Sequence, residues 1–170
     1  MSSGKKRRVQ SDNGVGSSLD RSPWVRFALY LTFCVSAAVL IMRGLALPDG
    51  FDEVSSESLR LDYALYGFFV AFSAVVVLEL SRDLTHGRNG RVILLLGGLL
   101  AHLGLMRGFV LLAEINELPP AVAFLLTPFV VAPMVHTVLL GRQAGVFSTI
   151  YVSLLGALVV TTEQKGIYLA

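Results

Sequence analysis

Two polar side chains interrupt one long apolar run of this 170-residue sequence. His102 falls near the middle of the apolar segment Val92–Ala113, and Arg107 follows one and a half helical turns later. An arginine at bilayer depth costs about 3 kcal/mol on insertion scales, so both side chains should face the protein interior or a cavity. They form either a proton- or ligand-responsive site, or a snorkelling arginine and a histidine hydrogen-bonded to a neighbouring helix.

The sequence offers few residues for metal binding, nucleotide binding or catalysis. The sequence contains three histidines and one cysteine, Cys34, and they show no metal-ligand spacing. No nucleotide-binding glycine motif or nucleophile motif is present, and the acidic segment 48–60 lacks the oxygen spacing of a calcium loop. The runs 92–113, 121–140 and 145–162 hold no internal carboxylate for acid–base work. We therefore predict no catalysis, no cofactor and no metal in this chain itself.

The composition indicates that these side chains are carried by membrane helices. Hydrophobic residues make up 54% of the chain and charged residues 15%, against about 25% charged in soluble domains. The mean hydropathy is +0.69. Runs of roughly 20 apolar residues predict an all-α polytopic membrane protein with about five transmembrane helices and membrane lipids around it. The net charge is only +2, and the basic residues lie in short blocks beside apolar runs. This pattern excludes a nucleic-acid partner.

Four segments follow from this pattern. We expect a disordered basic cytoplasmic tail at 1–23, an N-terminal anchor helix at 24–47, a short extracytoplasmic loop at 48–61 and a membrane domain of four spans at 62–170. A cleaved signal peptide is the rival for 24–47, but its apolar run is longer than a typical signal core. An uncleaved anchor is therefore favoured.

Charge patterning predicts the topology. The basic stretch 82–91 and Arg142 belong inside, and the acidic stretches 48–60 and 114–117 belong outside. All of them agree with a cytoplasmic N-terminus and a multi-pass protein of the cell membrane, typical of a bacterial inner membrane. The basic cluster at 5–8 is either one more topology signal or a contact to anionic lipid.

Small residues and prolines predict how the helices meet. Small side chains at helical spacing favour close helix packing inside the protein, with a homo-oligomer as the alternative for the GxxxG at Gly104 and Gly108. The prolines Pro128 and Pro133 should kink or partly unwind the segment 121–140. His136, one turn from the inner end, should reach the headgroups. The other small residues of this kind are Gly67, Ala71, Ala74, Gly97, Gly98 and Ala101.

The segment LLTPFVVAPMVHTVLLGRQAGVFSTIYVSLLGAL resembles part of the membrane region of the seven-transmembrane HD phosphohydrolase receptors. The resemblance covers roughly 61–160 and implies an anchor, an extracellular domain, seven spans and a cytoplasmic HD domain that hydrolyses a phosphodiester with two metals. This sequence has no HD domain, so no catalytic residue carries over, and the chain is either a fragment or a reduced member. The matching positions are Pro128, Met134, Leu139, Leu140, Arg142, Ala144, Ser148, Ser153 and Gly156.

Three functions are therefore open at this point. The resemblance favours a non-catalytic sensor or anchoring module for signalling, working with a cytoplasmic HD phosphodiesterase domain in a longer chain. A membrane subunit of a small-molecule importer would also suit the size and the polar pair His102 and Arg107. A structural envelope protein, whose spans only pack, is the third.

Overall fold

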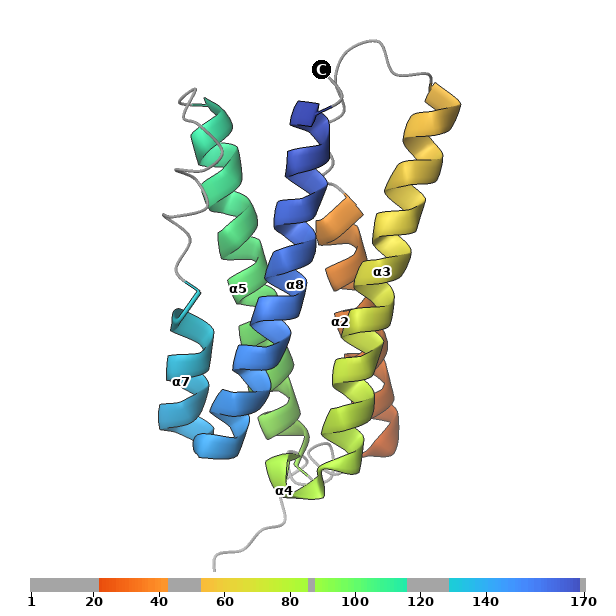
Figure 1. The fold of residues 1–170 in the computed structure, drawn as a ribbon. Helices are drawn as coiled ribbons and strands as arrows, with labels where there is room; N and C mark the ends of the chain where they lie inside the picture. The colour runs from red at the N-terminus through yellow and green to blue at the C-terminus, as the bar shows by residue number, and fades with distance from the viewer. Residues whose placement is uncertain (1–21, 43–52, 86–87, 116–128, 169–170) are drawn as a thin grey trace, which may run out of the picture.

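The regular structure of the chain is helical. The computed structural model describes residues 22–42, 53–85, 88–115 and 129–168. Its longer helices run up and down side by side (Figure 1). This confirms the predicted all-α polytopic fold. The elements in chain order are α2 (Pro23–Met42), α3 (Glu53–Leu80), α4 (Arg82–Thr85), α5 (Asn89–Ile115), α7 (Val131–Leu140) and α8 (Arg142–Tyr168).

Four of these helices are long and apolar enough to cross a membrane. The spanning parts are Pro23–Met42, Arg60–Leu80, Asn89–Leu112 and Arg142–Val159. The helix α7 has 10 residues. At 1.5 Å per residue it is about 15 Å long, half of a bilayer core. The predicted span 121–140 is described only from residue 129 onward.

The outer surface of the bundle is as apolar as its interior. Large hydrophobic side chains such as Trp24, Phe69, Ile115 and Val138 are 63–80% exposed. Soluble monomers rarely show apolar surface on this scale, whereas lipid favours it. Together with the spans, this surface identifies a multi-pass membrane protein.

The helix α8 is the shared packing partner of the bundle. It contacts α2, α3, α5 and α7, while α2 packs chiefly against α3, and α7 chiefly against α8 (Figure 1). The largest fully buried apolar side chains are Phe33, Ile41, Leu78, Leu95, Leu99 and Leu155.

The predicted small stripe of α3 lies inside the bundle, as expected. Ala71 and Ala74 are fully buried, and a side chain on Gly67 would collide with Ile41 of α2. The GxxxG of α5 behaves differently. Within the described part of the chain, nothing lies within 4 Å of where a Cβ on Gly104 or Gly108 would sit. The prediction that Gly104 and Gly108 pack closely against another helix of this protein is therefore wrong for the described helices. These helices contact α5 on its other faces.

The connection between α7 and α8 is a single residue. Gly141 has φ 100° and ψ 174°, a conformation that is open almost only to glycine, and its N–H donates to Thr137 O at 3.1 Å. The helix α8 then begins at Arg142. Arg142, Gln143 and Ala144 are good helix formers, so only Gly141 is needed to reverse the chain.

Other predicted boundaries also shift. The helix α3 starts at Glu53, inside the expected loop 48–61, because 53–61 contains neither Gly nor Pro. The helix α5 starts at Asn89, inside the basic stretch 82–91. The anchor 24–47 is seen as α2, which begins with Pro23 at a position that suits proline. Its last residues and the tail 1–21 lie outside the described residues.

The predicted proline kinks are not found in the described helices. Pro133 lies in the first turn of α7, and the first intrahelical bond comes from the next residue, Met134 N–H to Val130 O at 3.0 Å. A proline there loses no hydrogen bond, so it starts the helix without bending it. Pro128 lies outside the described residues, and a kink there stays a prediction.

Candidate functional site

Arginines gather at one end of the bundle. The helices α2, α5 and α8 begin there and α3 and α7 end there (Figure 1). We call it the basic end, after Arg26, Arg88, Arg91 and Arg142. The charge pattern of the sequence predicts that this end faces the cytoplasm.

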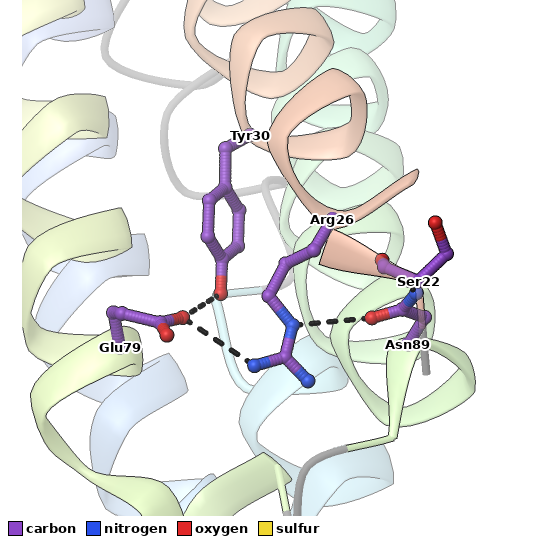
Figure 2. Close-up of polar contacts among 5 residues, drawn as sticks. All are labelled: Ser22, Arg26, Tyr30, Glu79 and Asn89. Carbon is purple, nitrogen blue, oxygen red and sulfur yellow. Dashed lines mark hydrogen bonds and ion pairs between the residues drawn. The ribbon is translucent and has the colours of Figure 1, made fainter. Parts of the chain in front are cut away.

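A polar network ties three helices together at the basic end. Arg26 Nε donates to Asn89 Oδ1 at 3.1 Å, and Asn89 Nδ2 donates to Ser22 O at 3.0 Å. Tyr30 Oη donates to Glu79 Oε2 at 2.7 Å, and Arg26 Nη1 lies 3.6 Å from the same oxygen. Figure 2 shows how these side chains from α2, α3 and α5 converge. The network fastens the starts of α2 and α5 to the end of α3, and sequence reasoning did not find it.

Asn89 should be the most sensitive residue of this network. It is 2% exposed and bonds both Arg26 and Ser22, so Asn89→Ala leaves two partly buried polar groups without this partner. We expect a loss of about 1–3 kcal/mol in unfolding free energy, measured by denaturant titration in detergent micelles. The exposed neighbour Arg88 provides the control, since Arg88→Ala should stay within about 0.5 kcal/mol. Equal losses in both variants would contradict a structural role for the network.

A second polar cluster lies inside the bundle, between α5 and α7. Leu94, Gly98 and His102 follow each other at intervals of four residues, so they share one face of α5. The His136 ring of α7 packs onto Gly98, where no Cβ would fit. His136 Nε2–H donates to Leu94 O at 3.2 Å, so the ring lies on the same face of α5 that carries His102.

Both imidazoles are buried and incompletely bonded. His102 is 3% exposed and His136 1%. Neither nitrogen of His102, nor Nδ1 of His136, has a hydrogen-bond partner among the described residues. A buried polar group without a partner costs about 1–3 kcal/mol, so such groups call for an explanation. Chemically, the cluster offers free nitrogen lone pairs that can accept a proton or a hydrogen bond.

The prediction for His102 and Arg107 is confirmed for their burial but not for their pairing. Both side chains are buried, as expected, with Arg107 9% exposed. They stand five residues apart, which turns them about 140° away from each other around α5. Arg107 also lies about 27 Å along the helix from Asn89, near the far end of the span. His102 therefore shares its face of α5 with the residues that His136 contacts, and not with Arg107.

His136 was misjudged from the sequence. Its place near the end of an apolar run predicted a side chain at the headgroups, but it is 1% exposed and faces α5. The only signal in the sequence was the pair Gly97–Gly98, which leaves room for a large neighbour. Nothing in the sequence said which neighbour would fill it.

Within the described ranges, no three His, Cys, Asp or Glu side chains come together where they could hold a metal ion. No family model, curated protein or solved structure matches this chain. The fold and the site therefore define a class, a multi-pass helical membrane protein with a buried histidine pair between two helices. The resemblance to HD phosphohydrolase receptors stays an expectation.

Proposed function

We propose that this chain is a non-catalytic sensor module of the membrane, and that the pair His102–His136 is its proton-responsive element. The observation that carries the proposal is the buried pair of imidazoles with unpartnered nitrogens in the described bundle. Ionisable groups at membrane depth are costly, and they usually mark functional sites. Histidine is the side chain that ordinarily changes its charge between pH 5 and 8.

The response follows from the cost of buried charge. Neutral imidazoles are tolerated in the apolar interior, whereas a proton on either ring places a positive charge there. The carboxylate nearest in sequence on α5, Glu114, comes 12 residues after His102, about 18 Å along the helix, and Glu163 falls near the far end of α8. Protonation should therefore favour a state in which the pair separates and reaches polar surroundings. The other titratable side chains on α5, α7 and α8 are Arg91, Arg107, Arg142, Tyr151, Lys165 and Tyr168.

Of the two interfaces of α7, the one with α5 is the less extensive, so we expect α7 to separate from α5 first. The helix α7 is short and packs chiefly against α8, and less extensively against α5. Its last residue leads through Gly141 directly to Arg142 at the basic end. A shift of α7 would therefore move that end of the bundle. A cytoplasmic partner, such as the HD phosphodiesterase domain that the resemblance implies, could respond to this movement.

Distances between labelled helices test the proposal. Spin labels at Ile93 of α5 and Val138 of α7, both exposed, report the α5–α7 spacing in a Cys34→Ala background. We expect this spacing to change by about 2 Å between about pH 8 and about pH 5, the size of common helix shifts, and to recover on return. Pulsed electron paramagnetic resonance on the chain in nanodiscs measures the distance between the two labels.

Histidine variants provide matched controls. His102→Gln together with His136→Gln should abolish the change, and His86→Gln, which removes the third histidine of the chain, should leave it intact. A spacing that stays constant with pH, or that still changes in the double variant, would overturn the proposal. A constant spacing would leave a bundle whose spans only pack. Co-purification with an ATPase pair would favour the importer instead.

The phosphodiesterase partner needs a separate measurement. The intact mass of the native gene product can be compared with the 18.4 kDa of this chain. A much larger mass, with a His- and Asp-rich domain following, supports an attached HD domain. A mass near 18.4 kDa would contradict the proposal of an attached HD domain. It would not bear on the proposed proton response.

A further inference from the structure

An open groove runs along the outside of the bundle near the basic end. It lies between the end of α3, with α4, and the start of α8, and has a volume of about 860 Å³. That volume falls within the range of ligand-binding sites, about 300–1,000 Å³. The groove belongs neither to the histidine pair nor to the polar network.

The walls of the groove are apolar and uncovered. Val77 and Leu80 of α3 are 39% and 79% exposed, and Val146 and Ile150 of α8 are 54% and 51% exposed. The buried side chain of Phe147 also lines the groove. In a membrane protein, an apolar groove on the outer surface is open to lipid chains.

The rim of the groove is polar and carries a positive charge. Arg142 and Gln143, the first residues of α8, line the groove and are exposed, and Ser81 lines it from the end of α3. None of the described residues that line the groove is acidic. The positive end of the α8 dipole lies at the same place and adds to the field of Arg142.

We propose that this groove binds an anionic phospholipid. The phosphate of its headgroup meets Arg142 and Gln143, and an acyl chain lies along Val77, Val146 and Ile150. Two features favour this occupant over a protein segment. The groove is amphipathic along its length, as a lipid is, and Arg142, the charged side chain among its described lining residues, complements an anionic headgroup.

Lipid competition tests the proposal directly. The full chain in detergent is given equal amounts of phosphatidylglycerol and phosphatidylcholine with the same acyl chains, and native mass spectrometry counts the lipids retained. We expect phosphatidylglycerol to be retained preferentially. Arg142→Gln should reduce this preference about fivefold, since one basic residue near the membrane surface contributes about 1 kcal/mol. Arg88→Gln, at the same end but outside the groove, should leave the preference unchanged.

The acyl-chain contact has its own test. Val146→Trp fills the groove and should reduce retention of both lipids, whereas Val138→Trp, on the exposed side of α7, should not. Equal retention of the two lipids by the wild-type chain would overturn the proposal. So would displacement of the bound lipid by inorganic phosphate alone, or a dimer that forms through the groove and dissociates in Val146→Trp.

Discussion

Replacing Gly98 with alanine should destabilise the protein by about 1–3 kcal/mol, the usual cost of overpacking an interior. The added Cβ would stand 2.8 Å from Cε1 and 3.4 Å from Cδ2 of His136, and closer still to Nε2. The ring cannot swing away without giving up its hydrogen bond to Leu94 O, a loss of about another 0.5–1.5 kcal/mol. The better helix propensity of alanine returns about 1 kcal/mol. The unfolding free energy in detergent micelles measures the net result.

The neighbouring glycine is the matched control for this prediction. Gly97 lies on the same helix, and in the described structure nothing is within 4 Å of where its Cβ would stand. Gly97→Ala should therefore stabilise the protein by up to about 1 kcal/mol through helix propensity alone. The two adjacent substitutions thus have opposite expected signs. If Gly98→Ala also stabilised the protein, the packing of His136 on α5 would be wrong.

Gly145→Ala should cost about 2–3 kcal/mol, because its collision includes the backbone of the facing helix. A Cβ on Gly145 would lie 3.0 Å from Cβ and 3.3 Å from Cα of Thr137, and closer to its hydroxyl. The hydroxyl cannot easily turn away, since Thr137 Oγ1 donates to Pro133 O at 2.7 Å. The helices α7 and α8 would have to separate next to their one-residue turn. The same unfolding measurement reports the loss.

Two further variants separate this collision from a general effect of substitution. Gly104→Ala, with open space at its Cβ position among the described residues, should be neutral or slightly stabilising. Thr137→Ala in the Gly145→Ala background removes the hydroxyl and the γ-methyl group but leaves Cβ and Cα of residue 137 in the way, so it should restore only part of the stability. Full restoration would mean that the hydroxyl alone sets the distance between α7 and α8.

Together these glycines explain how a helix of 10 residues holds its place. Gly98 lets α7 approach α5 on one side, and Gly145 lets it approach α8 on the other. The close contact at Gly145 includes the backbone of Thr137, whereas the close contact at Gly98 is made by the His136 side chain, and α7 packs less extensively against α5 than against α8. This asymmetry is why a charge on the His102–His136 pair should open the α5 side first.

The amino-acid sequence by itself determined the class of this protein. Bilayer thickness sets the length of an apolar run, and the cost of charge in lipid places the arginines at the ends of the spans, so spans and their alternation can be predicted directly. The burial of His102 and Arg107 and the close packing of Gly67, Ala71 and Ala74 follow from the same costs.

Only the tertiary structure decided which helix faces meet. In lipid the outward side chains are as apolar as the inward ones, so no amphipathic period marks the packed face of α5 or α7. From the sequence, His136 was therefore interpreted as a headgroup contact and Gly104 as a packing residue, and the role of Asn89 was not found. Each depends on the rotation of one helix about its axis relative to another. That rotation is set by contacts between residues far apart in the chain, such as His136 with Leu94 and Asn89 with Arg26.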